Sequence, residues 1–184
     1  MPKKPFQIML DIETLGTKPG AIITDIAAVS FELETGRIHD SMDMKISRAS
    51  CERLGMHADP ETMEWWDEQG GHDEGEGVRF SMDAALGMLR HFIDFAKPQA
   101  IWCWGVSFDF PLLEDAYDRC DMVPAWKYYQ QRCARTFCKT ISPSLERKPV
   151  KHCALDDCFA QISDLVGCYQ AAHSPRTLSF QKPA

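Results

Sequence analysis

The feature that most constrains this chain is an apolar run over residues 8–15 that carries two acids near its end and is followed by a glycine. On a β-strand, side chains two positions apart point to one face, so Asp11 and Glu13 project together while the apolar residues alternating with them point the other way. Adjacent carboxylates repel unless a cation neutralises them, and Mg²⁺ and Mn²⁺ bind carboxylate oxygens. A strand that emerges into solvent would tolerate the same acids, so this stretch alone leaves both interpretations open.

Two later segments supply further acids in a recognisable order. Phe108 and Asp109 follow a short apolar segment, and His152 stands five residues before Asp157. Together with the first pair, these blocks resemble the DEDDh (DnaQ-like) 3′ to 5′ exonucleases of the RNase H-like fold. The pattern of that superfamily is Asp-x-Glu, then Phe-Asp, then His-x-x-x-x-Asp. The three blocks span residues 11–157, which is most of the chain.

The resemblance implies an α/β fold with an RNase H-like mixed sheet flanked by helices, and phosphodiester hydrolysis by two ions of Mg²⁺ or Mn²⁺. Two such ions, about 3.5–4 Å apart, can hold both the attacking and the leaving oxygen. By resemblance, Asp11, Glu13 and Asp157 would hold one ion. Asp11 would bridge to the second, which Asp109 completes. His152 would be the general base, because imidazole can take a proton near neutral pH.

The expected substrate is the 3′ end of single-stranded RNA or DNA, released as mononucleotides. Thr14 and Leu15 match family positions that cradle the terminal nucleotide, and Phe108 is assigned to the same subsite. RNA is preferred, because the Trp-Gly-x-Ser-Phe-Asp form of the second block and the early Trp-Trp pair resemble a bacterial and phage branch of exoribonucleases or exonuclease VIII-like proteins. The alternatives are a DNA-specific exonuclease, a polymerase proofreading-type subunit, or an inactive nucleic-acid-binding module. No acid of the pattern is missing, which favours an enzyme.

Two positions depart from the family pattern or compete with it. Many relatives have Asn where this chain has Gly105, so a contact made there is absent or supplied elsewhere. Asp156 is a rival ligand beside Asp157, and the offset from His152 favours Asp157. Residues five apart on one helix differ by about 140°. We therefore expect His152 in a loop and Asp157 in the first turn of the last helix.

Length and composition indicate one domain, residues 1–172, with a tail at 173–184. A chain of 184 residues that is 45% hydrophobic is long enough for one α/β domain with a sizeable core and too short for two such domains. No signal-peptide pattern begins the chain, and no apolar run approaches the roughly 20 residues of a membrane helix. We expect a cytoplasmic protein without membrane contact, whose cysteines are free thiols.

The cysteines near the last block allow one further interpretation, a structural zinc site. Their spacing lacks the paired form typical of such sites, so we expect them to act as small buried apolar residues. The residues concerned are Cys133, Cys138, His152, Cys153 and Cys158.

Charge is distributed unevenly along the chain. The net charge of −7 argues against binding nucleic acid over the whole surface. Residues 57–76 are rich in acids and contain no Lys or Arg, whereas residues 132–151 are basic with Glu146 as their one acid. Both segments are consistent with solvated loops, but the basic one could bring a phosphate backbone to the acids.

A pair of adjacent tryptophans lies in a helix predicted from Asp59 to about Gln69, which has an N-cap acid followed by proline. Adjacent residues on a helix lie about 100° apart, so Trp65 and Trp66 cannot both be fully buried on one narrow stripe. One is expected in the core and the other at an interface or at the rim of the core, with a base-stacking platform as the alternative. Because small related exonucleases are often homodimers, we expect a homodimer here.

The remaining pattern predicts alternating strands and helices. Strands are expected at 21–33, 39–46 and 100–104, and helices at 81–96, from 111, at 124–138 and at 155–171.

Overall fold

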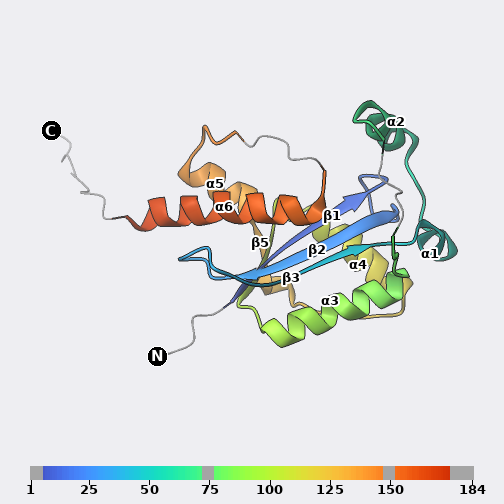
Figure 1. Ribbon diagram of the computed structural model, residues 1–184, viewed down its shortest axis with the longest axis horizontal. Helices are drawn as coiled ribbons and strands as arrows, with labels where there is room; N and C mark the ends of the chain where they lie inside the picture. Colours follow the sequence, from blue (N-terminus) through green and yellow to red (C-terminus); the bar gives the residue numbers. More distant parts are fainter. Residues whose placement is uncertain (1–5, 72–76, 147–151, 175–184) are drawn as a thin grey trace.

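The centre of the molecule is a five-stranded mixed sheet (Figure 1). A computed structural model describes residues 6–71, 77–146 and 152–174. The strands are β1 (Gln7–Thr14), β2 (Ile23–Phe31), β3 (Ile38–Lys45), β4 (Ala100–Cys103) and β5 (Gln131–Cys133). Their order is β3-β2-β1-β4-β5, with β1, β2 and β3 antiparallel and β4 and β5 parallel to β1. The predicted RNase H-like mixed sheet is therefore confirmed.

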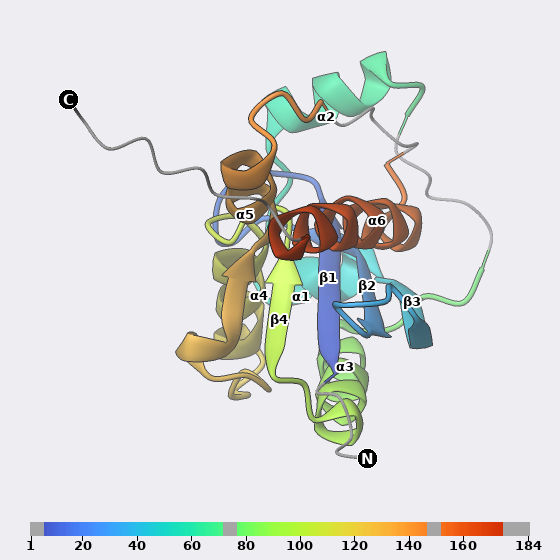
Figure 2. The same cartoon turned by 90° about the vertical axis from the view of Figure 1, so that its left-hand side faces the viewer.

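Helices cover both faces of this sheet. They are α1 (Arg48–Arg53), α2 (Pro60–Glu68), α3 (Met82–Ala96), α4 (Asp109–Arg119), α5 (Ala134–Ile141) and α6 (Ala154–His173), with a 3₁₀ turn η1 (Tyr128–Gln130). Residues of α3 and α4 pack on one face, and residues of α5 and α6 pack on the other. Both views show α2 beyond the end of β1, near the start of α6 (Figure 2).

Strand β1 separates two cores because its side chains alternate between the faces. Ile8 and Leu10 join the core under α3 and α4, whereas Met9 joins the core under α5 and α6. Asp11 and Glu13 continue the series of Met9, so they point to the face that α6 covers. The sheet thus directs both acids toward the helix that carries the third block.

Most predicted helices and strands are present, and their ends show why. Asp59 caps α2 by accepting a hydrogen bond from the Glu61 amide at 3.0 Å, with Pro60 first in the helix. Helix α3 ends at Lys97, whose φ of 48° is left-handed and stops the helix. These caps are local, which makes them readable from sequence.

The predicted helix at 124–138 is wrong. That segment contains η1, the strand β5 and only the start of α5. Strand β5 pairs with β4 in parallel, from Ile101 opposite Gln131 to Cys103 opposite Cys133. This pairing across the sheet overrides the weak local preference. The short helix α1 was not predicted either, because six residues give too little periodicity. The predicted tail lies almost wholly outside the described residues.

Candidate active site

Three predicted metal ligands come together at the end of β1. Oxygen atoms of Asp11, Glu13 and Asp157 all lie within 4.8 Å of one another, and each of these residues is partly buried. Among the described residues, this is the cluster of acids, histidines and cysteines that could hold a metal ion. The alternative zinc site is thus not supported by the described part of the chain.

Helix α6 delivers Asp157 to the cluster from its first turn. The Asp157 amide donates to the carbonyl of Cys153, which caps the helix, so Asp157 lies where the helix dipole favours negative charge. One turn later, Gln161 Nε2 donates to Asp11 Oδ1 at 2.6 Å. Helix α6 therefore supplies one carboxylate and fixes the orientation of another.

Asp109 lies beside this cluster at the start of α4. It is the first residue of the helix and is only 3% exposed. Its charge raises the pKa of Asp11, which places the two carboxylates close enough to interact. Asp109 does not belong to the tight three-residue group. The four predicted acids thus form a close triad with a fourth, buried neighbour.

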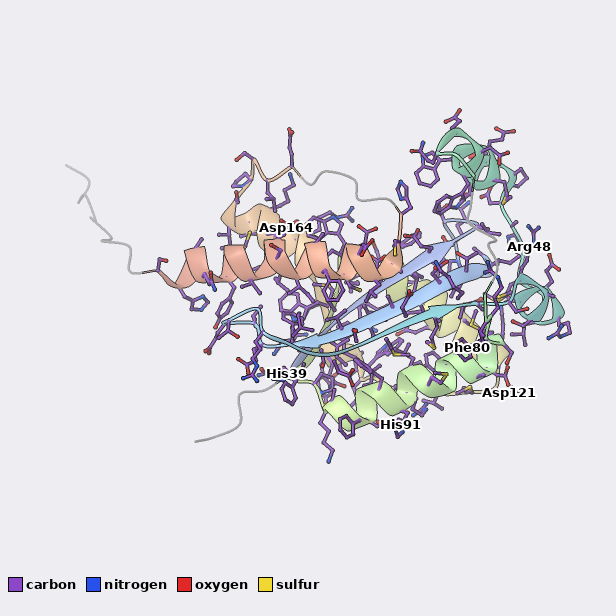
Figure 3. All side chains as sticks on the ribbon, viewed as in Figure 1. His39, Arg48, Phe80, His91, Asp121 and Asp164 are labelled. Atoms are coloured by element: carbon purple, nitrogen blue, oxygen red, sulfur yellow. The ribbon has the colours of Figure 1, made fainter. Side chains whose placement is uncertain are left out.

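Two acids labelled in Figure 3 do not belong to this cluster. Asp121 lies below the sheet in that view and Asp164 lies partway along α6, both away from the end of β1. The cluster draws its acids from β1 and from the start of α6.

Burial and mutual repulsion raise the pKa values of Asp11 and Glu13 when no cation is present. Burial, then the charge of Asp109, raises the pKa of Asp11 well above its usual range, and the hydrogen bond from Gln161 opposes this rise. Burial and the charges of Asp157 and Asp25 raise the pKa of Glu13 to about 8. Buried, mutually repelling oxygen ligands are the donor set that hard divalent cations neutralise. The residues present therefore fit a divalent metal.

The pKa of Asp109 is also raised, but by burial against several opposing hydrogen bonds. Burial raises its pKa, while hydrogen bonds from the Cys103 thiol and from the backbone at Gly105 and Ile12 oppose the rise. These donors hold the carboxylate in one orientation at the junction of β4 and α4.

A partly buried ion pair, which no local sequence pattern predicted, lies beside Glu13 in the sheet. Asp25 on β2 lies opposite Glu13 in the strand register, and Lys45 on β3 lies opposite Asp25 and forms an ion pair with it. The charge of Lys45 opposes the rise in the pKa of Glu13. Knowing the register would have revealed this line of charges, but no local pattern did.

His152 lies outside α6, as predicted, just before the cap residue Cys153. Its ring contacts both indoles of α2, with centroid distances of 4.7 Å to Trp65 and 5.4 Å to Trp66. No local pattern predicts this contact, because the two segments are far apart in the chain.

A pocket of about 440 Å³ opens beside the acids. Thr14 and Phe108, two predicted substrate-binding residues, line it. Leu15 does not line it, since its side chain is 1% exposed and packs into the core. The lining residues are Ile12, Glu13, Thr14, Thr17, Asp59, Glu61, Thr62, Trp65, Trp66 and Phe108.

The tryptophan pair divides as predicted, with Trp66 5% and Trp65 40% exposed. The exposed indole lies in the pocket and against His152. Its incomplete burial is therefore explained by the site, and it gives no argument for a dimer interface.

One cation lies close to the second block. A Cβ added to Gly105 would come within 3.3 Å of Arg135 Nη2, so the guanidinium occupies the space that a side chain at this position would need. The residue that replaces the family's Asn is thus covered by an arginine from α5.

Carboxylates gathered at the end of the central strand, beside a pocket whose tryptophans contact His152, fit a nuclease of the RNase H-like class. The family model of the 3′-5′ exoribonuclease Rv2179c-like domain matches residues 6–166. The chain belongs to this family and is a 3′ to 5′ exonuclease domain.

The chain is also similar to individual exonucleases. The exodeoxyribonuclease of Enterobacteria phage T4 is 27% identical over 126 residues, which cover 60% of this chain and 55% of the phage protein. E. coli exonuclease I in complex with a dA13 oligonucleotide has a TM-score of 0.63 at 17% identity, covering 88% of this chain and 40% of that one. A product-bound exonuclease I structure has a TM-score of 0.61 at 14% identity, covering 92% and 43%. The likeness to these structures shows the fold, and the chain spans roughly half or less of each relative.

None of the helices in the described ranges is long and apolar enough to cross a membrane.

Proposed function

We propose that this protein removes mononucleotides from the 3′ end of single-stranded nucleic acid, with two divalent ions, Mg²⁺ or Mn²⁺. The observation that carries the proposal is the group of three carboxylates within 4.8 Å of one another, with a pocket beside it. Asp11, Glu13 and Asp157 would hold one ion, and Asp11 with Asp109 the other. Once bound, such ions activate water and neutralise the charge of the leaving oxygen.

The protein's own residues have separate tasks in this reaction. His152 accepts the proton of the attacking water on a ring nitrogen. Gln161 keeps the Asp11 carboxylate in one orientation through its hydrogen bond. Phe108 and Thr14 line the pocket that receives the terminal nucleotide. The 3′ end is thereby held beside the acids in the reactive orientation, so the reaction does not pay the entropy cost of bringing the groups together.

RNA is the preferred substrate in this proposal. Support comes from the family, whose description is that of an exoribonuclease domain. The structure also removes the one candidate for excluding a 2′-hydroxyl by bulk, since Leu15 is buried away from the pocket. The Leu15 amide already donates to the Ile22 carbonyl at 2.8 Å. A 2′-hydroxyl would therefore be recognised by polar side chains of the pocket. Glu13 is the first candidate, because it lines the pocket and also belongs to the carboxylate cluster.

DNA is the competing substrate, because the phage T4 relative is an exodeoxyribonuclease and exonuclease I was solved with DNA oligonucleotides. Comparing kcat/KM on RNA and on DNA of the same nucleotide sequence decides between the two substrates. A DNA strand with a single 3′-terminal ribonucleotide then locates the discrimination. We expect RNA to be degraded faster and the chimera to lose its first nucleotide at the RNA rate. Equal rates on all three would remove the RNA preference.

The direction of hydrolysis has its own test. An oligonucleotide blocked at its 3′ end should survive while the matched free strand is shortened one nucleotide at a time. Equal cleavage of both strands would identify an endonuclease and overturn the proposal.

A further inference from the structure

The imidazole of His152 packs against two indoles that also contact each other. Its ring lies 4.7 Å from Trp65 and 5.4 Å from Trp66, at interplanar angles of 80° and 81°. The two indoles are themselves 5.0 Å apart and edge-on. Each of the three rings therefore meets the other two in the T-shaped arrangement that aromatic pairs favour.

The indoles are fixed to the strand that carries the acids. Trp66 Nε1 donates to the Thr14 carbonyl at 3.0 Å, in the last residue of β1. The Asp59 amide, at the cap of α2, donates to the Leu15 carbonyl at 2.6 Å. Helix α2 is thus attached twice to the end of β1, just past Asp11 and Glu13.

The position of the His152 ring depends on contacts with other elements, because His152 does not belong to a helix or strand. His152 precedes the cap of α6 and so lies outside the helix that positions Asp157. A general base acts only when its nitrogen is within hydrogen-bond reach of the water, and a displacement of about 1 Å can cost about 100-fold in rate. The contacts with Trp65 and Trp66 connect the ring, through α2, to the end of β1.

We propose that Trp65 and Trp66 are positioning residues that hold the His152 imidazole over the carboxylate cluster. The inference rests on the proposed function, in which His152 is the general base. Trp66 is also part of the core, so its replacement would disturb folding. Trp65 is 40% exposed, which makes it the residue to vary.

A rival role for Trp65 is stacking on a nucleotide base, because it lines the pocket with Phe108. The two roles predict different kinetics. Loss of a stacking surface weakens substrate binding whether or not His152 is present. Loss of a positioning contact lowers turnover only while His152 is there to be positioned.

The experiment is a double-mutant cycle of Trp65→Leu with His152→Ala, measured as kcat and KM on a single-stranded oligonucleotide with Mg²⁺. We expect Trp65→Leu to lower kcat about 10- to 100-fold with KM changed less than about twofold. In the His152→Ala background, the same change should have no further effect on kcat. Trp65→Phe, which keeps an aromatic ring, should restore most of kcat. Phe95→Leu is the matched control, since Phe95 is an exposed aromatic residue on α3.

A second readout reports on the ring itself. The imidazole resonances of His152, assigned by comparison with His152→Ala, should shift in Trp65→Leu as the ring current of the indole is lost. Phe95→Leu should leave them in place. This measurement needs no substrate and no metal.

The outcomes separate the two levels of the proposal. An unchanged kcat in Trp65→Leu, with His152→Ala strongly impaired, overturns the positioning role alone. A rise in KM that is equal in both backgrounds overturns it in favour of base stacking. Full activity in His152→Ala overturns the role assigned to His152 in the proposed function, and the positioning role with it.

Discussion

The acids of the site should destabilise the protein whenever their cation is absent. Burial and neighbouring charges raise the pKa of Glu13 from 4.5 to about 8. Between these two values the folded protein holds a proton that the unfolded chain has released, so stability falls as pH rises through this window. Each pH unit of that window is worth about 1.4 kcal/mol. Partial solvent contact screens some of this, which leaves about 1–3 kcal/mol at pH 7.5.

The perturbation that isolates this effect is Glu13→Gln, which removes the charge and keeps the shape. For a domain of this size, about 1–3 kcal/mol corresponds to a Tm increase of about 3–10 °C. We expect that increase in chelator at pH 7.5 and a much smaller one at pH 5. With saturating Mg²⁺ the order should reverse, because the wild type gains binding energy that the variant has lost.

Thermal unfolding followed by circular dichroism provides the measurement, at both pH values, with chelator and with Mg²⁺. Glu68→Gln serves as the matched control, since Glu68 is an exposed acid at the end of α2. An unchanged or lower Tm for Glu13→Gln in chelator at pH 7.5 would refute the reasoning. So would an equal gain at pH 5 and pH 7.5, because the effect would then not depend on ionisation.

Four further predictions concern ligands and assembly. Asp11→Ala should abolish turnover and weaken metal binding in calorimetry, whereas His152→Ala should lower turnover about 10²- to 10⁴-fold with metal binding intact; equal losses of affinity would make His152 a ligand. Gln161→Leu should weaken metal binding because it frees the Asp11 carboxylate, and unchanged calorimetry would contradict this. Arg135→Ala should raise KM and flatten its salt dependence with kcat nearly unchanged, because an exposed guanidinium beside Gly105 can hold a substrate phosphate; a fall in kcat alone would count against it. Sedimentation at micromolar concentration tests the predicted homodimer, and a clean monomer would refute it.

How much could be predicted from sequence depended on the range of the interactions involved. Asp11 and Glu13 share a face because of strand geometry, and Asp157 reaches them because its helix begins there. Both follow from local rules once the fold is assumed. The pairing of Trp65 with His152 depends on how α2 lies over the end of β1, which no local pattern encodes. Leu15 was misjudged for the same reason, since its neighbours alone do not reveal that it turns into the core.

Gln161 and Asp25 were missed for a related reason. Each is a buried polar residue, Gln161 in a helix and Asp25 in a strand that both carry other polar residues as well. From sequence, a polar residue in such an element has many explanations. Only the register of β1 with β2 and the packing of α6 on β1 show that both residues serve the same carboxylate cluster.

The order in which the site's residues occur along the chain has a consequence for synthesis. Strand β1 leaves the ribosome early, whereas Asp157 lies in α6, the last helix of the described chain. A nascent chain that has completed the whole sheet still lacks the third carboxylate, the glutamine that orients Asp11, and the histidine. On the proposed mechanism, the nascent chain is inert as a nuclease until α6 emerges and docks.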